Sequence, residues 1–502
     1  MRSIIAALGI VALSIVAIAQ SSMVRIPKTF DDQAIATLEV PLAVKTASPV
    51  QTPSKLYYSA SVAPIYKSYP IYRPDKEPPG YIEWLKQQEP QIVFDASALK
   101  GQADWIQAGE LVFDQPIAYT PLDADSMKQD VRNRRWYDQT EVPVVKDGTL
   151  PFLKYVIREK GKVEIGSFSC GSCHTRVMPD GTVIKGAQGN FPFDRAFAWN
   201  LRNALVRQIP GDPLTQARIG EKVLYAAPWI QGDENVDQLS LEEIAARHEA
   251  IPPGVMARHG TSPLSPTKVP DLIGVRDRRY LDATGLVRHR EIDDLMRYAA
   301  LNQGADFSAR YGSFIPAALF APGQTASFQP TRYSDEQLYA LALYVYSLQP
   351  PKNPNRFDSQ TARGQKIFER EGCAGCHTPP LYTNNKLTLA KGFTPTSENL
   401  TRLDILPISV GTDPNLALKT RRGTGYYKVP SLKGVWYRGP FEHNGSVANL
   451  EDWFDPSRLR DDYVPTGFRG AGVKARAVKG HEFGLSLSAE DKRALIAFLK
   501  TL

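Results

Sequence analysis

All the cysteines of this chain fall in two copies of one five-residue pattern, C-x-x-C-H. The copies consist of Cys170, Cys173 and His174, and of Cys373, Cys376 and His377. Two thiols at this spacing can add across the vinyl groups of a haem, and the histidine that follows can ligate its iron. A zinc site would need the cysteines gathered at one centre or helped by histidine pairs, and a redox dithiol does not require the histidine. The pattern therefore predicts two covalently bound haem c groups with proximal histidine ligands.

The amino terminus has the pattern of a secretory signal peptide. Arg2 precedes an uncharged apolar run over residues 4–19, which ends in a small-x-small cleavage site before Gln20. This run is shorter than the ~20 residues that cross a bilayer as a helix, so we expect cleavage and no stable membrane span; an uncleaved anchor is the alternative. Because haem c is attached outside the cytoplasmic membrane, we expect a periplasmic or secreted protein.

Length and charge limit the classes of function. A chain of 502 residues is too long for one core and predicts two or three domains. The net charge of +7 is small for this length, and no basic cluster with interleaved aromatic residues occurs, so nucleic acid is not an expected partner. The slight basic excess would suit an acidic electron-transfer partner, such as a redox protein or a quinol-linked cytochrome.

An internal repeat divides the chain. Residues 268–275, KVPDLIGV, match residues 428–435, KVPSLKGV, and a further glycine follows at the same distance in both copies, at Gly285 and Gly445. Each copy lies downstream of its own C-x-x-C-H motif. The sequence also predicts a helix before each haem motif and a closing helix with an acidic first turn after each repeat. These helices are expected at 105–113, 361–371, 334–348 and 488–502.

Helix, haem motif, loops and closing helix is the element order of a small cytochrome c. We therefore predict a mainly α fold, with two cytochrome c-like haem domains in tandem behind a Pro- and Tyr-rich N-terminal extension. Prolines in the extension and between the halves block regular elements. The expected segments are a signal peptide at 1–19, the extension at 20–100, haem domain 1 at 101–351 and haem domain 2 at 352–502.

The supply of distal ligands distinguishes the two predicted haems. The loop before the last helix contains His481, and His443 lies further upstream. No methionine follows Met296, which excludes a methionine ligand from within the second domain. We expect His481 to be the distal ligand of haem 2, with His443 as the second candidate. Two imidazoles would give haem 2 a relatively low reduction potential.

Haem 1 is expected to have an open position. The corresponding loop, residues 303–332, contains neither His nor Met, and Ala283 stands where the second copy has His443. An open position suits a haem that reacts with an oxidant, whereas an electron carrier fills both positions. Other segments could still close the site through Met178, His248, Met256, His259, His289 or Met296.

Further residues are candidates for the redox chemistry. Trp199 and Trp436 are candidate bridges between the haems, because an indole ring can be oxidised, although a tryptophan is more often part of the core. Glu249 and Arg258 are candidates for moving protons. The aromatic residues that could cover the open face of haem 1 are Tyr311, Phe314 and Phe320.

From about residue 105 to the carboxyl end, the sequence resembles the bacterial di-haem cytochrome c peroxidase and MauG superfamily. The two C-x-x-C-H motifs and residues 428–454, KVPSLKGVWYRGPFEHNGSVANLEDWF, carry the resemblance. Within that superfamily, HNGSV at 443–447 and GHEFG at 480–484 look closest to the branch of the haem rubber oxygenases.

The resemblance implies an oxidoreductase that activates hydrogen peroxide or dioxygen at one haem while the other exchanges electrons; a non-catalytic di-haem electron carrier is the alternative. The peroxidases place a Met, and the MauG type a Tyr, where this chain has Ser457, which favours two histidines on haem 2. The peroxidases also bind calcium between their domains, through backbone oxygens near the residue that matches Pro440. Calcium is therefore a further candidate cofactor, although Arg438 replaces the usual small residue.

Overall fold

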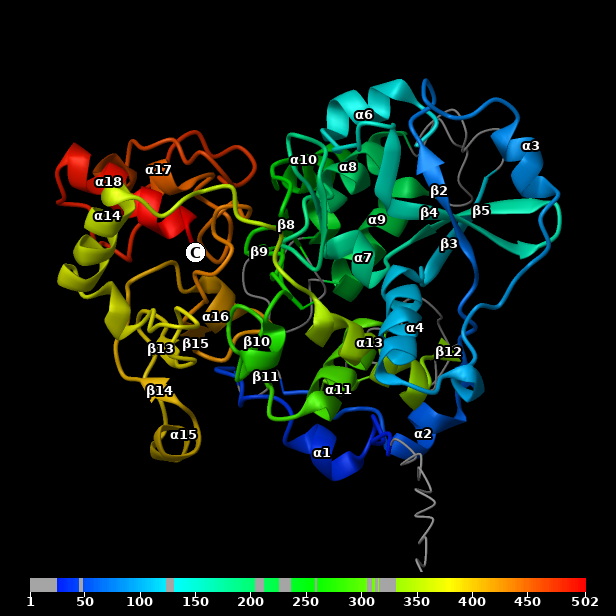
Figure 1. Cartoon of the computed structure of the whole chain (residues 1–502), viewed down its shortest axis with the longest axis horizontal. Coiled ribbons are helices and arrows are strands. Elements are labelled where there is room, and N and C mark those ends of the chain that lie inside the picture. The colour runs from blue at the N-terminus through cyan, green and yellow to red at the C-terminus, as the bar shows by residue number, and fades with distance from the viewer. Residues whose placement is uncertain are drawn as a thin grey trace, which may run out of the picture.

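Helices are the larger part of this fold, and its sheets are small (Figure 1). The predicted mainly α fold is therefore confirmed only in part, because the described sheets include one of four strands. The predicted signal peptide lies outside the described residues. None of the helices in the described ranges has both the length and the apolar character needed to cross a membrane. The computed structural model describes residues 25–44, 48–122, 131–203, 212–224, 236–257, 260–304, 309–311, 315 and 331–502.

Two long helices pack against each other in each half of the chain. In the first half, α4 (Gln102–Asp114) packs along α13 (Asp335–Ser347). In the second half, α14 (Ser359–Arg370) packs along α18 (Ala489–Lys500) (Figure 1). The helices expected before each haem motif and after each repeat are thus present, and each opening helix contacts its own closing helix.

A glycine permits the close approach within each helix pair. A Cβ atom added to Gly109 of α4 would lie 2.0 Å from the carbonyl oxygen of Ala340 in α13. A Cβ atom added to Gly364 of α14 would lie 2.0 Å from the carbonyl oxygen of Ala494 in α18. The two halves therefore use the same contact between their opening and closing helices.

The internal repeat has the same backbone in both copies. Three pairs of equivalent positions have positive φ angles within a few degrees of each other: Gly274 and Gly434 (71° and 75°), Asp282 and Glu442 (70° and 68°), and Gly285 and Gly445 (65° and 72°). The copies also exchange hydrogen bonds reciprocally. The N–H of Lys268 donates to the carbonyl of His443 at 2.8 Å, and the N–H of Lys428 donates to the carbonyl of Ala283 at 3.1 Å.

The two repeat lysines, Lys268 and Lys428, each lie in the second strand of an antiparallel strand pair. In the first half, β8 (Val255–Met256) pairs with β9 (Thr267–Lys268), and in the second half β13 (Leu387–Leu389) pairs with β15 (Tyr426–Lys428). Both pairs are antiparallel, and each places its repeat lysine opposite the first residue of the partner strand. The two repeats therefore face each other across the junction between the halves.

An antiparallel sheet joins three strands of the insertion between α4 and the first haem motif to one strand of the N-terminal extension. Its strands have the order β2-β4-β5-β3, and β4 and β5 form a hairpin. Inward-facing residues of β4, including Phe152, Tyr155 and Ile157, pack in a core with Trp136. The strands are β2 (Ser68–Tyr72), β3 (Ala118–Pro121), β4 (Thr149–Glu159) and β5 (Lys162–Ser167).

Shorter elements complete the described part of the fold. The helices are α1 (Asp32–Ala36), α2 (Ser54–Ser59), α3 (Tyr81–Lys86), α6 (Arg134–Thr140), α7 (Cys170–Cys173), α8 (Phe193–Asn203), α9 (Pro213–Leu224), α10 (Leu241–Glu249), α11 (Ile292–Asn302), α15 (Ser397–Arg402), α16 (Asn415–Lys419) and α17 (Leu450–Trp453). The strands are β1 (Ser61–Val62), β6 (Thr175–Val177), β7 (Val183–Lys185), β10 (Tyr280–Leu281), β11 (Val287–Arg288), β12 (Thr331–Arg332) and β14 (Ile405–Leu406).

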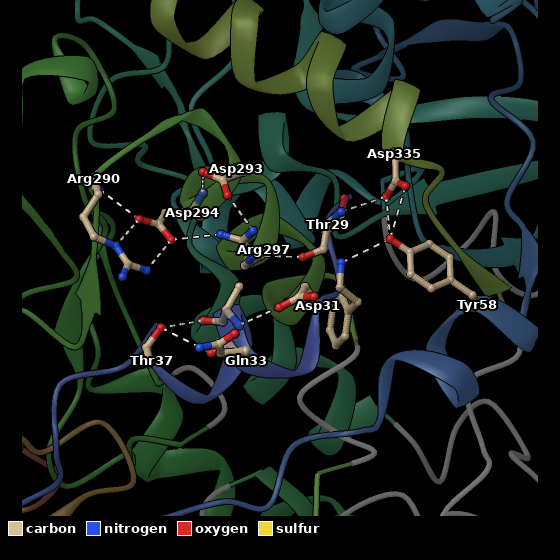
Figure 2. A network of polar contacts seen from close by, with 12 residues as sticks. Thr29, Asp31, Gln33, Thr37, Tyr58, Arg290, Asp293, Asp294, Arg297 and Asp335 are labelled. Atoms are coloured by element: carbon tan, nitrogen blue, oxygen red, sulfur yellow. Dashed lines mark hydrogen bonds and ion pairs between the residues drawn. The ribbon is translucent and has the colours of Figure 1, made fainter. Parts of the chain in front are cut away.

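Polar contacts attach the N-terminal extension to the first half (Figure 2). The buried guanidinium of Arg297 in α11 donates from Nε to the carbonyl of Thr29 at 3.0 Å. The N–H of Thr29 donates to Asp335, the first residue of α13, also at 3.0 Å. Asp335 in addition accepts a hydrogen bond from the hydroxyl of Tyr58 at 3.0 Å. The extension is therefore tied to both the closing helix and its neighbour.

The same extension also contacts the second half. The buried Val40 packs with Leu387 and Tyr426. Glu39 forms an ion pair with Arg421 at 2.9 Å, and the N–H of Ala43 donates to a backbone carbonyl of the second half at 2.9 Å. The extension thus spans the junction between the halves.

A buried histidine joins α8, α9 and α10. The ring of His248 lies with Nδ1 2.7 Å from Asp194 and with Nε2 2.7 Å from Glu221, and all three side chains are buried. Burial by itself lowers the pKa of His248, but the hydrogen bonds to the two carboxylates outweigh this effect and raise it to about 9. Burial raises the pKa of Asp194. At neutral pH the three helices are therefore held by a buried imidazolium.

Substitution of Gly109 tests the helix contact. Alanine is the better helix former, but at this position its Cβ would collide with backbone atoms of α13, so we expect Gly109→Ala to lower the free energy of unfolding by about 1–3 kcal/mol. Gly220→Ala in α9 is the matched control, because a Cβ there meets nothing within 4 Å and should stabilise by up to about 1 kcal/mol. Urea unfolding measures both. Equal stability of the two variants would refute the contact.

The buried imidazolium predicts a loss of stability at alkaline pH. The pKa of His248 is higher in the folded than in the unfolded chain, so its contribution is complete below 6.5 and disappears as the pH rises through about 9. The pKa of Asp194 is also raised, so the folded chain loses stability as the pH rises through the titration of this carboxyl group, at a lower pH than that of His248. We expect His248→Gln to cost about 3–5 kcal/mol at neutral pH and to remove the alkaline dependence.

The control for this prediction is His289→Gln. His289 is also buried, but its ring contacts neutral groups, the carbonyl of Arg278 and the hydroxyl of Tyr346, and burial lowers its pKa. Its loss should leave the alkaline dependence in place. Urea unfolding across the pH range would contradict the account if His248→Gln kept the wild-type dependence.

Candidate haem sites

The two C-x-x-C-H histidines are oriented by the same position of the repeat. Nδ1 of His174 lies 2.9 Å from the carbonyl oxygen of Pro270, and Nδ1 of His377 lies 3.1 Å from that of Pro430. A carbonyl only accepts, so each Nδ1 carries the proton and each Nε2 keeps the lone pair that a metal requires. The K-V-P repeat therefore fixes the tautomer of both predicted proximal ligands.

Burial keeps the second proximal histidine neutral. Burial lowers the pKa of His377 to about 4. Since the neutral imidazole is the form that ligates iron, the site holds this residue in its ligating form at physiological pH.

The cysteines of both motifs lie in a single tight turn. The N–H of each motif histidine donates to the carbonyl of the first cysteine, at 2.9 Å for Cys170 and 2.8 Å for Cys373. In the first motif, the buried hydroxyl of Ser172 also donates to the carbonyl of Phe152 in β4, at 2.6 Å. Burial raises the pKa of Cys170 and of Cys373 to about 11. Neither thiol is therefore poised as the thiolate that a reactive dithiol would need.

A cavity of about 260 Å³ lies beside the second motif. Cys373, Cys376 and His377 line it on one side, and His481 lines it as well. Its walls are largely apolar, as a porphyrin requires. The apolar residues that line it include Phe368, Val435, Leu450, Phe454, Leu495 and Leu499.

The two histidines of this cavity have the spacing of axial ligands. The ring centres of His377 and His481 are 6.3 Å apart. Metal–imidazole bonds of about 2 Å on each side of an iron place the ring centres at roughly this separation. Nδ1 of His481 is buried and has no hydrogen-bond partner among the described residues. The residues present therefore fit a haem, which Cys373, Cys376, His377 and His481 would hold.

The loop around His481 is held by backbone geometry and by a buried arginine. A Cβ at Gly480 would lie 2.3 Å from the backbone nitrogen of Thr412, so only glycine fits this close approach. Arg458, which is 1% exposed, donates to the carbonyls of Trp453 (2.9 Å), Val478 (2.6 Å) and His481 (2.8 Å). Sequence reasoning missed Arg458, because none of its partners lies beside it in the chain.

His443, the second candidate, lines the same cavity but has other partners. Its Nδ1 lies 2.9 Å from Glu442, and its ring stacks on Tyr427 with 4.4 Å between ring centres. Its Nε2 lies 3.3 Å from the hydroxyl of Tyr427. Both ring nitrogens of His443 are thus engaged, whereas His481 presents its ring toward His377.

The first haem site contains the predicted cysteines and His174, but most of its distal loop lies outside the described residues. The same holds for Arg258, His259, Phe314 and Phe320. Of the residues that could close the site, His248 and His289 have both ring nitrogens hydrogen-bonded. Met296 is buried in the core of the first half. Met178 and Met256 are partly buried, the latter in β8, and Tyr311 is buried and contacts Arg421.

The remaining sequence candidates have structural partners. Glu249 forms an exposed ion pair with Arg202 at 2.7 Å. Trp199 lies in the core around Trp136 and the sheet. Trp436 packs where the halves meet, against a cluster that includes Met178, Ile184 and Leu348 of the first half.

The predicted calcium position does not fit a cation. The guanidinium of Arg176 donates to the carbonyl of Gly439 at 2.9 Å, and the side-chain amide of Gln188 donates to the carbonyl of Pro440 at 3.0 Å. These are the backbone oxygens that calcium would need. Since a guanidinium already donates to one of them and a side-chain amide to the other, the residues here argue against calcium.

No family model matches the chain. Part of it is 26% identical over 214 residues to cytochrome-c peroxidase IdrP1 of Pseudomonas sp. (strain SCT), covering 39% of this chain and 52% of that protein. It is 25% identical over 164 residues to IdrP1 of Denitromonas iodatirespirans, covering 29% of this chain and 40% of that protein. The chain thus spans about half, or less, of the length of these relatives.

Two solved structures are also similar to the chain. They are the hydrazine synthase of Kuenenia stuttgartiensis (TM-score 0.28, 17% identity, 57% of this chain and 87% of that chain) and a MauG-like protein associated with microbial copper homeostasis (TM-score 0.22, 18% identity, 34% and 56%). At these TM-scores they carry no argument. The sequence relatives support a resemblance to cytochrome-c peroxidases. They do not distinguish the branch of the haem rubber oxygenases.

Proposed function

We propose that the chain is an exported oxidoreductase with two covalent haems, in which haem 1 reacts with peroxide or dioxygen and haem 2 relays electrons. One observation carries the proposal: both C-x-x-C-H histidines are held by equivalent proline carbonyls, and the imidazole of His481 lies 6.3 Å from that of His377, as a closed haem 2 requires. Haem 1 is assigned the open position because residues 303–332 contain neither His nor Met. A bound haem supplies one-electron chemistry, and an open iron position admits the oxidant.

The proposal assigns one haem to each half, as two cytochrome c-like domains over residues 101–351 and 352–502. The equivalent helix pairs, the shared backbone of the repeat and the reciprocal hydrogen bonds support this division. The HNGSV and GHEFG segments favour the haem rubber oxygenase branch within the superfamily. An oxidant and a redox protein are the partners that this assignment requires, in the periplasm or outside the cell.

The residues have separate tasks in this proposal. His174 and His377 hold the proximal positions, and His481 closes the distal position of haem 2. Arg458 fixes the backbone of His481 by donating a hydrogen bond to the carbonyl oxygen of that residue. Trp436 is better placed than Trp199 to pass an electron between the halves, because its neighbours belong to both.

Spectra of the purified protein test the proposal. We expect one high-spin and one low-spin haem by electron paramagnetic resonance, carbon monoxide binding to one haem after reduction, and a reaction of that haem with hydrogen peroxide. Two low-spin haems that ignore both ligands in every redox state would contradict the proposal and leave a non-catalytic electron carrier.

Substitution of the two distal candidates distinguishes their roles. We expect His481→Ala to convert haem 2 to a high-spin form, so that the protein binds two equivalents of carbon monoxide, because the facing imidazole is removed. His443→Gln lies in the same cavity and serves as the control, with haem 2 remaining low-spin. The reverse pattern in the absorption and resonance spectra would assign the ligand to His443.

A further inference from the structure

Four cationic side chains line the cavity that contains His377 and His481. They come in equivalent pairs, because each copy of the repeat continues to an arginine ten residues after its lysine. We refer to these four residues as the interface cations. They are Lys268 and Arg278 of the first copy and Lys428 and Arg438 of the second.

The interface cations are interleaved between the halves. Lys268 interacts electrostatically with Arg438 of the other copy, and Lys428 interacts with Arg278. Burial, with the charge of the neighbouring arginine, lowers the pKa of Lys268 to about 8 and that of Lys428 to about 7. Like charges at the edge of an apolar cavity repel each other unless anions join them.

The nearby carboxylates balance these charges only in part, because one carboxylate serves both arginines. Asp271 lies 4.0 Å from Arg278 and 3.7 Å from Arg438. No carboxylate of the described residues forms an ion pair with Lys268 or Lys428.

The other two acids of the region have their own partners. Glu442 pairs with His443 at 2.9 Å, and Asp282 pairs with Arg422 at 2.6 Å. In addition, Nε of Arg438 is buried without a hydrogen-bond partner in the described part of the chain. Arg278 already donates to the carbonyls of Asp271 and Ile273. The two lysines and Nε of Arg438 are therefore the donors that the cavity offers to anionic groups.

We propose that the interface cations bind the propionate carboxylates of the two haems and so form one shared anion site between them; this rests on the proposed function. Two haems bring four carboxylates, which matches the four cations. For haem 2 the assignment follows from the cavity, which is lined by His377 and all the interface cations. For haem 1 it follows from the repeat, in which each lysine precedes by two residues the proline that orients a proximal histidine.

This site has an electrostatic consequence that can be measured without an activity assay. Reduction of a haem removes one positive charge from its iron, so a nearby cation favours the reduced form. We expect Lys268→Gln and Lys428→Gln each to lower the ratio of reduced to oxidised haem 2 about tenfold at a fixed applied potential, which is about 59 mV for a one-electron couple. Spectroelectrochemical titration of the low-spin haem in the intact two-haem protein gives this ratio.

Matched variants separate charge from structure. Lys433→Gln removes the same charge from an exposed position of the same segment and should leave the ratio unchanged. Lys268→Arg keeps the charge and should restore the wild-type ratio. If both interface variants carry two haems and titrate like Lys433→Gln, the proposal is overturned.

A second measurement uses the wild-type protein and does not depend on how the variants fold. Cations already bound to haem carboxylates should not respond to a free anion, so the potential of haem 2 should be equal in chloride and in phosphate at the same ionic strength. A saturable shift with phosphate would show that the site takes a free anion, and would overturn the proposal. A haem 1 with ligands at both axial positions would refute the proposed function. The potential of haem 2 could still be measured in the variants and in the two anions, so the two failures can be told apart.

Discussion

The structure depends on the hydrogen bond from each C-x-x-C-H histidine to a proline carbonyl. This bond joins residues that are 96 positions apart in the first half and 53 apart in the second. It couples a local turn, which the cysteine spacing alone would form, to the segment that builds the junction between the halves. The same segment exchanges backbone hydrogen bonds with its counterpart and carries the interface cations. The same segment therefore both orients the predicted proximal ligands and joins the two halves.

The two halves share this frame, and the described residues show in detail how the second half builds its distal side. In the second half, Gly480 allows the loop to approach Thr412, and Arg458 fixes three carbonyls around it, so the imidazole of His481 has little freedom. In the first half, the available buried histidines serve other purposes. His248 joins three helices through two carboxylates, and His289 contacts neutral acceptors and donors. The proposed division of labour between a closed and an open haem would require that the first half supplies no distal ligand.

Sequence reasoning reached the features that are local or repeated. The cysteine spacing, the K-V-P repeat and the periodicity of the four long helices are all contained in short windows, and the structure places each accordingly. The preference for His481 over His443 rests on the loop before the closing helix, which is a defined place in a cytochrome c, and it remains a prediction. The open state of haem 1, the domain boundaries and the signal peptide remain predictions.

Features that depend on distant partners could not be read from the sequence. In the sequence, Arg458 cannot be distinguished from a surface arginine, because its three carbonyl partners are known only from the fold. Likewise, only the fold shows that Arg176 donates to a carbonyl oxygen that calcium would need. The lysines of the repeat were visible as a motif, but their convergence required the reciprocal packing of the two halves. The four-stranded sheet was missed because its strands lie in an insertion and an extension with many prolines and tyrosines.

The mass of the denatured, exported protein tests the central claim most directly. Thioether bonds survive denaturation, so the account predicts a polypeptide that carries two haems, and a variant with Cys373 and Cys376 replaced by alanine that carries one. A wild-type protein that loses all its haem on denaturation, or that carries a single haem, would contradict the account.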